Sequence, residues 1–186
     1  FESCRLIEEI IVVVNGHDIV YCKENIIDAF GFTKVAKLVA GASTRQGSVY
    51  KGLCEVREVC DIVLIHDGAR PFVTEQCLKD SIYAAQEYGA CCLAVPVKDT
   101  VKEVDEQGFV RKTLNRNSLW AIQTPQTFKY RLILDAHIKA AQEGFIGTDD
   151  ATLVERMGHP LKLIMGDYNN IKITTQEDLI LAEAIL

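Results

Sequence analysis

The run His66-Asp67-Gly68-Ala69-Arg70-Pro71 carries side chains that could do chemistry, and it directly follows the branched apolar residues 63–65. Those apolar residues predict a buried parallel strand, and open α/β sheets bind ligands at the carboxyl ends of such strands. Asp67 offers a hard oxygen ligand suited to Mg²⁺, and the guanidinium of Arg70 suits a phosphate. An Asp-Gly turn beside a surface ion pair accounts for the same residues equally well. The run by itself therefore leaves a nucleotide site and a plain turn as open interpretations.

The elements that must position this run alternate between strands and helices. β-Branched runs predict strands at residues 9–15, 35–40, 62–65 and 91–96. Helices are expected near residues 21–30, 48–57 and 74–88, with Ser48 near the amino end of the second, Thr74 as the N-cap of the third and Gly89 at its end. This order predicts an α/β fold with a mainly parallel, twisted sheet covered on both faces.

The two ends of the chain add further elements. Residues 1–7 are interpreted as the tail of a helix already under way, and the chain opens with Phe1 rather than Met, which indicates a fragment or a chain whose first part is absent. Residues 129–142 form an amphipathic pattern, Thr148 is expected to cap a helix through residue 157, and residues 161–165 predict a strand. Thr174-x-x-Glu177 is a capping box that opens the last helix.

Residues 97–128 do not follow this alternation of strands and helices. Polar and apolar residues alternate around Glu106-Gln107-Gly108, which predicts a β-hairpin, and a second extended piece brings the chain back without a helix. Such an antiparallel excursion is either a decorated edge of the sheet or an arm that packs against another subunit. The alternation alone slightly favours the decorated edge.

Composition limits the class of protein. A chain of 186 residues with 48% hydrophobic content can bury one substantial core, so we expect a single domain spanning 1–186. A net charge of −6 argues against non-specific nucleic-acid binding, and neither a transmembrane run nor a signal peptide is found. The seven cysteines lack any C-x-x-C spacing, so we expect buried, reduced thiols in a cytoplasmic protein without a membrane or nucleic-acid partner.

Several segments together resemble one enzyme family. They are Gly41-Ala42-Ser43-Thr44-Arg45-Gln46-Gly47-Ser48-Val49, His66–Phe72, Pro96–Thr100, Asn115–Trp120, Gln123–Gln126, Thr148–Ala151 and Asn170–Thr174. In this order they resemble 2-C-methyl-D-erythritol 4-phosphate cytidylyltransferases of the non-mevalonate isoprenoid pathway, over essentially the whole chain. Ala42, Gly47 and Asn115 depart from the family's usual glycine, aspartate and aspartate. The resemblance implies a Rossmann-like three-layer sandwich of the nucleotide-diphospho-sugar transferase type, with residues 97–128 as a protruding β-arm.

The resemblance also implies a reaction. A phosphate oxygen of methylerythritol 4-phosphate would attack the α-phosphorus of CTP and release pyrophosphate. A phosphate dianion needs no general base, so catalysis should rest mainly on cationic residues and Mg²⁺ that position the two anions and offset their repulsion. The family pattern assigns catalytic roles to Asp67, as the Mg²⁺ ligand, and to Arg116 and Lys172. The CTP-binding residues implied are Gly41, Ala42, Ser43, Ser48, Gly68 and Arg70.

For the phosphorylated polyol, the resemblance implies binding by Thr100, Arg116, Thr124, Thr148, Asp149 and Lys172. Some of these would come from a partner subunit, which makes residues 97–128 a dimer arm and reverses the preference for a decorated edge. In the family, a first strand and a glycine-rich loop hold the CTP triphosphate. These would precede Phe1, so the chain as printed is expected not to turn over.

Two other functions stay open. A cytidylyltransferase for ribitol 5-phosphate or another polyol phosphate would share the core motifs, although Gly68-Ala69 and the segment 115–120 fit the methylerythritol enzymes better. A non-catalytic nucleotide-binding module would need no cations for a second phosphate, whereas Asp67, Arg116 and Lys172 are all present. No role is assigned to His66 or to the other three histidines.

Overall fold

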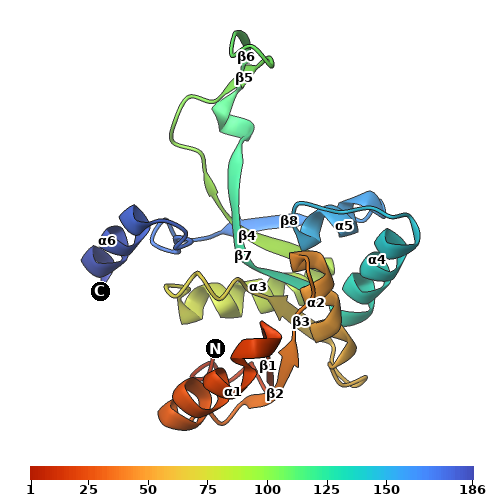
Figure 1. Ribbon diagram of the computed structural model, residues 1–186. Coiled ribbons are helices and arrows are strands. Elements are labelled where there is room, and N and C mark those ends of the chain that lie inside the picture. The colour runs from red at the N-terminus through yellow and green to blue at the C-terminus, as the bar shows by residue number, and fades with distance from the viewer.

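Strands of two adjoining sheets form the frame of the molecule in the computed structural model, which describes residues 1–186 (Figure 1). The first sheet pairs β1 (Ile10–Val14) and β2 (Val35–Ala40) in parallel. The second has the order β3-β7-β4-β8, formed by Ile62–Ile65, Trp120–Lys129, Ala90–Pro96 and Lys162–Met165. The predicted strands are confirmed, since runs of Val, Ile and Ala fit a pleated sheet. β4 is buried along almost its whole length, whereas β1 and β2 are only partly buried.

Strand β7 is the antiparallel member of the second sheet. It pairs antiparallel with both β3 and β4, whereas β4 and β8 are parallel, so β3, β4 and β8 run in one direction. The predicted Rossmann-like α/β class therefore holds, with one reversed strand in the middle of the sheet. Because β7 lies between β3 and β4, the excursion that ends in it does not decorate a sheet edge.

Helices cover these sheets (Figure 1). Helix α1 (Ile19–Cys22) continues into a wider helical turn at Lys23–Asp28, and the other helices are α2 (Arg45–Cys54), α3 (Glu75–Tyr88), α4 (Tyr130–Gln142), α5 (Asp150–Arg156) and α6 (Gln176–Ile185). The largest core cluster joins the ends of β4 and β7 to α2, α4 and α5 through side chains that include Leu53, Phe128, Ile133 and Val154. No helix is long and apolar enough to cross a membrane.

The helix boundaries confirm some sequence predictions and correct others. Thr74 caps α3, and Gly89 ends it with a φ of 84°. The N-cap of α2 is Thr44, so the helix begins three residues before the predicted start at Ser48, which lies near its amino end. Asp149, not Thr148, caps α5. The capping box of α6 joins Thr175 to Asp178, one residue later than predicted. All these residue types cap well, and local backbone geometry chooses among neighbours.

Residues 1–7 are not the tail of a helix. They form two turns, and the Glu2 carboxylate accepts hydrogen bonds from the backbone and hydroxyl of Thr33. Cys4 and Ile7 pack with Leu78 and Ile82 of α3. Their apolar side chains are thus spaced for packing onto α3, and this spacing resembles that of a helix.

The first part of the excursion, residues 97–119, projects from the sheets (Figure 1), whereas its last part forms β7 between β3 and β4. Its tip is the predicted hairpin, formed by β5 (Lys102–Val104) and β6 (Val110–Thr113), which pair antiparallel. The expectation that this stretch holds no helix is wrong for one turn, since Arg116–Ser118 form a short 3₁₀-helix with Asn115 as its N-cap.

Candidate active site

Asp67 lies just beyond the carboxyl end of β3 and forms ion pairs with two cations. Its Oδ1 is 3.2 Å from Nε of Arg45, and its Oδ2 is 3.0 Å from Nζ of Lys172. Partial burial alone would raise the pKa of this carboxyl, but the hydrogen bond from Lys172 and the charge of Arg45 outweigh it and hold the pKa below its usual value. Asp67 is therefore ionised at neutral pH, as a metal ligand must be.

Lys172 reaches Asp67 because the segment after β8 is tied to the loop after β3. The backbone N–H of Ile173 donates to the carbonyl of Ala69 at 2.8 Å, and the guanidinium of Arg70 donates to the carbonyl of Asn170 at 2.7 Å. The Asn170 side chain, fully buried, donates to the carbonyl of Thr124 at 2.9 Å. The structure thus brings together Asp67, Arg70 and Lys172, which the sequence predicted to act together.

Arg70 is partly buried, and one of its nitrogens is engaged by the Asn170 carbonyl. Thr124 is also occupied within its own chain: it is 5% exposed, and its hydroxyl accepts a hydrogen bond from the backbone N–H of Asp67 at 3.0 Å. The same hydroxyl lies 3.1 Å from Nδ1 of His66. Burial lowers the pKa of that imidazole, which favours its neutral form.

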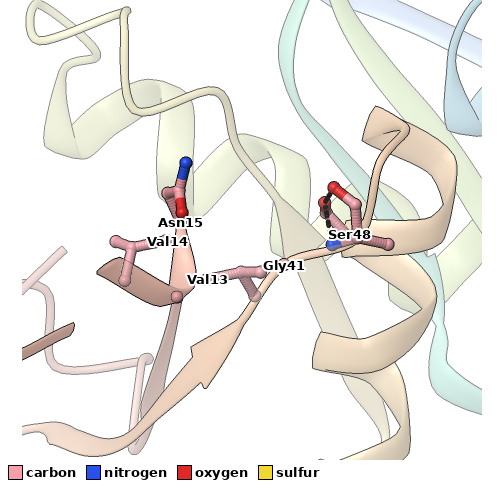
Figure 2. A pocket seen from close by; sticks show the side chains of 7 residues that line it. Val13, Val14, Asn15, Gly41 and Ser48 are labelled. Carbon is pink, nitrogen blue, oxygen red and sulfur yellow. Dashed lines mark hydrogen bonds between the residues drawn. The ribbon is translucent and has the colours of Figure 1, made fainter. Parts of the chain in front are cut away.

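A cavity of about 290 Å³ opens at the carboxyl ends of β1 and β2 (Figure 2). Its lining consists of Val13, Val14, Asn15, Gly16, Gly41, Ala42 and Ser48. This position suits a ligand in an α/β sheet. Three predicted CTP-binding residues line it, whereas Ser43, Gly68 and Arg70 do not. Asn15 and Gly16 were not among the predicted site residues, although their place at the end of the predicted strand 9–15 was a signal.

Ser48 shapes the wall of this cavity. Its Oγ accepts a hydrogen bond from the backbone N–H of Ala42 at 2.9 Å (Figure 2). It donates one to the carbonyl of Thr44, also at 2.9 Å. Gly41 packs so closely that a Cβ at this position would lie 2.9 Å from the Ser48 Oγ. The segment 41–48 is therefore a compact turn with its backbone held against the cavity.

Arg45 is the main residue that the sequence analysis missed. Besides Asp67, its guanidinium pairs at 2.8 Å with Oδ2 of Asp150, whose side chain is only 1% exposed. The other oxygen of Asp150 lies 3.1 Å from Nε2 of the buried His137. Burial alone would lower the pKa of Arg45, but the two carboxylates outweigh it and raise the pKa. Arg45 lies within the segment 41–49 that carried the resemblance, which was the available signal.

Asp149 and Thr148, predicted to bind the polyol, act here as the start of α5. The Asp149 Oδ1 accepts hydrogen bonds from the backbone and hydroxyl of Thr152, and its Oδ2 accepts one from Gln126. The Thr148 hydroxyl lies 3.2 Å from that of Thr152. Gln126 also accepts from the first backbone N–H groups of α5, so β7 and α5 are joined by polar contacts.

Arg116 and Thr100 belong to the arm. The guanidinium of Arg116 donates to the carbonyl of Lys98 at 2.8 Å, and both Arg116 and Thr100 are exposed. Neither forms a hydrogen bond or an ion pair with Asp67 or Lys172 of the same chain. One chain thus presents two groups of predicted site residues: one around Asp67 and one on the arm.

Comparison with known proteins decides the family. A family model described as 2-C-methyl-D-erythritol 4-phosphate cytidylyltransferase matches residues 1–186. The chain belongs to this family. A cytidylyltransferase of that name from Caldanaerobacter subterraneus subsp. tengcongensis is 52% identical over the whole chain, which covers 82% of that protein. One from Alkaliphilus oremlandii is 50% identical over the whole chain, which covers 79% of that protein.

Solved structures of cytidylyltransferases share the fold. The 4-diphosphocytidyl-2C-methyl-D-erythritol synthase from Anaerococcus prevotii matches with a TM-score of 0.90 and 36% identity, over 98% of this chain and 80% of that one. The 2-C-methyl-D-erythritol 4-phosphate cytidylyltransferase from Thermus thermophilus matches with a TM-score of 0.78 and 30% identity, over 96% of this chain and 98% of that one. These matches confirm the family resemblance and the fold class predicted from the sequence.

Proposed function

We propose that this protein joins CTP and 2-C-methyl-D-erythritol 4-phosphate, giving 4-diphosphocytidyl-2-C-methyl-D-erythritol and pyrophosphate. The observation that carries the proposal is the ionised Asp67 between Arg45 and Lys172, on loops at the carboxyl ends of strands, in a chain of the cytidylyltransferase family. A substrate phosphate oxygen forms the new bond to the α-phosphorus of CTP. The bond from that phosphorus to the bridging oxygen breaks, and pyrophosphate leaves.

The donor set around Asp67 fits Mg²⁺. No cluster of three or more His, Cys, Asp or Glu is available, so Asp67 would be the protein's carboxylate ligand. This suits Mg²⁺, which keeps several waters and is commonly held by one or two carboxylates and substrate phosphates. When bound, the ion neutralises charge on the CTP phosphates. Arg45 and Lys172 hold the carboxylate that the ion would use, so binding of the ion would exchange these contacts.

Lys172 would bind the phosphate of the second substrate and offset its repulsion by CTP. Its side chain is 43% exposed and its ammonium already lies beside a carboxylate, so it can move to an incoming phosphate at little cost. Arg70 would act mainly by holding the carbonyl of Asn170, two residues before Lys172. Gly68 leaves open space at its Cα, which would let the ribose approach the backbone.

The cavity beside Gly41, Ala42 and Ser48 would take the cytosine. Backbone groups of a rigid turn can satisfy the polar edge of a pyrimidine while a limited volume excludes a purine. Ser43 is exposed beside this cavity and would contact the nucleotide from its rim.

The arm would complete the second substrate's site in a homodimer. Arg116 and Thr100 project with the arm, and its tip exposes Val104, Phe109 and Val110, which are 53%, 70% and 59% exposed. Apolar side chains on a projecting hairpin suit burial against a second copy. Thr124, Thr148 and Asp149 would then support this site from their positions near Asp67. The seven free thiols fit a reducing cytoplasm.

Pyrophosphate release by the intact protein tests the proposal, with CTP, Mg²⁺ and either methylerythritol 4-phosphate or ribitol 5-phosphate. We expect release with methylerythritol 4-phosphate and its loss in Lys172→Ala. Lys139→Ala removes an exposed lysine of α4 and is the matched control. Preference for ribitol 5-phosphate would transfer the assignment to the related polyol enzymes. Absence of release with both would favour a non-catalytic nucleotide-binding module.

A further inference from the structure

We propose that His66 is a positioning residue for Asp67, because its two ring nitrogens tie the metal-binding loop to β7. The proposal rests on the Mg²⁺ role of Asp67 set out above. His66 precedes Asp67, and both of its ring nitrogens are engaged inside the fold.

A chain of hydrogen bonds runs through the ring. The backbone N–H of Asp67 donates to the Thr124 hydroxyl at 3.0 Å, and this hydroxyl lies 3.1 Å from Nδ1 of His66. On the other side, Nε2 of His66 lies 3.0 Å from the backbone carbonyl of Arg70. The imidazole therefore joins both ends of the loop 67–70 to a buried residue of the central strand.

The partners determine where the protons lie. A carbonyl only accepts, so Nε2 must carry a hydrogen that it donates to Arg70. Thr124 already accepts from Asp67, and its own hydrogen finds an acceptor at Nδ1 only if Nδ1 is unprotonated. A hydrogen on Nε2 and none on Nδ1 thus satisfies all of these groups.

This network suits a metal-binding loop better than further ion pairs would. The contacts of the Asp67 carboxylate with Arg45 and Lys172 are replaceable, because Mg²⁺ would compete for the same oxygens. The bonds through His66 use the backbone of Asp67 and none of its carboxylate oxygens. They hold the aspartate in place whatever its carboxylate binds.

Three substitutions separate the two ends of the ring. His66→Asn keeps an acceptor near the position of Nδ1, His66→Gln keeps a donor near that of Nε2, and His66→Phe keeps only the packing against Phe1. We expect the Mg²⁺ concentration for half-maximal pyrophosphate release to rise about tenfold in the Gln and Phe variants, as for loss of one buried hydrogen bond, and less in Asn. The KM for the polyol phosphate should change by less than about twofold. His159→Gln, away from this loop, is the control.

A purely structural histidine would give another pattern. If Asn and Gln raise the Mg²⁺ requirement equally, or if all three variants lose melting temperature without a change in that requirement, the proposal is wrong. ¹⁵N NMR of histidine-labelled protein provides a measurement that does not depend on activity. We expect a hydrogen on Nε2 of His66 and a pattern that changes in Thr124→Val, and an Nδ1–H tautomer would overturn the proposal. Full activity of Asp67→Asn would instead refute the Mg²⁺ role of Asp67. The NMR result would still test the hydrogen bonds of the His66 ring.

Discussion

Arg45→Met should destabilise the protein far more than the loss of an exposed arginine normally does. The guanidinium neutralises Asp150, whose side chain is only 1% exposed, at a distance of 2.8 Å. Removing one partner of a fully buried pair costs about 3–5 kcal/mol, because the other charge is left uncompensated. The Arg45 side chain is 37% exposed, so water already screens the pair, and we reduce the expected cost to about 2–3 kcal/mol.

The matched control is Arg57→Met. Arg57 pairs with Glu9 at 2.7 Å, but its side chain is 58% exposed and that of Glu9 is 20% exposed. Such a surface pair contributes at most about 1 kcal/mol. Urea unfolding followed by circular dichroism measures the free energy of unfolding of both variants. In thermal unfolding, a chain of this size should lose about 2–4 °C of melting temperature per kcal/mol of lost stability.

The double variant Arg45→Met/Asp150→Asn tests the cause. A neutral amide at position 150 needs no cation, so we expect the double variant to be more stable than the sum of the two single losses predicts. A free energy of unfolding for Arg45→Met within about 0.5 kcal/mol of the Arg57→Met value would refute this account of the buried carboxylate.

Three further predictions follow from single contacts. Gly41→Ala places a Cβ 2.9 Å from the Ser48 Oγ, which should cost about 1–2 kcal/mol through overpacking. We expect the KM for CTP to rise about tenfold, and an unchanged KM would disprove a role for this turn. Phe109→Asp at the exposed arm tip should convert a dimer into monomers in light scattering, and a stable dimer would exclude this contact. Burial raises the pKa of the Cys91 thiol to about 12, so a thiol reagent at pH 8 should label the exposed Cys54 in folded protein and Cys91 only after unfolding, whereas equal rates would contradict the burial.

Local sequence patterns were sufficient for most of the elements. The β-branched runs gave all five strands expected outside residues 97–128, and Thr74 with Gly89 marked both ends of α3 because each has a distinct local conformational role. Ser48 failed as a helix start for the same local reason: Thr44 has an extended backbone and its hydroxyl reaches the N–H of Gly47. Ser and Thr are both common N-cap residues, so residue type alone could not choose Thr44 over Ser48.

Local sequence patterns could not predict the long-range ion pairs. Arg45 and Asp150 lie on helices far apart in the sequence, and nothing in either local segment indicates that one neutralises the other. The turns at residues 1–7 failed in a similar way, since Glu2 is bonded to Thr33 across the fold. Motif matching assigned Asp67 and Lys172 to one site, and the structure places their side chains 3.0 Å apart, but the motifs did not predict that Lys172 and Arg45 form ion pairs with the Asp67 carboxylate.

The charge around Asp67 gives a physical reason to expect a metal in the reaction. Arg45, Arg70 and Lys172 supply three positive charges, and the carboxylates of Asp67 and Asp150 supply two negative ones, so the cluster carries a formal charge of +1. Two phosphorylated substrates bring several negative charges to the same place, and a cluster of +1 cannot offset them. A divalent cation on Asp67 and Arg116 from a partner's arm would add the missing positive charge. We therefore expect pyrophosphate release to stop when EDTA removes divalent metal and to return with added Mg²⁺, and metal-independent turnover would require other cations to supply the charge.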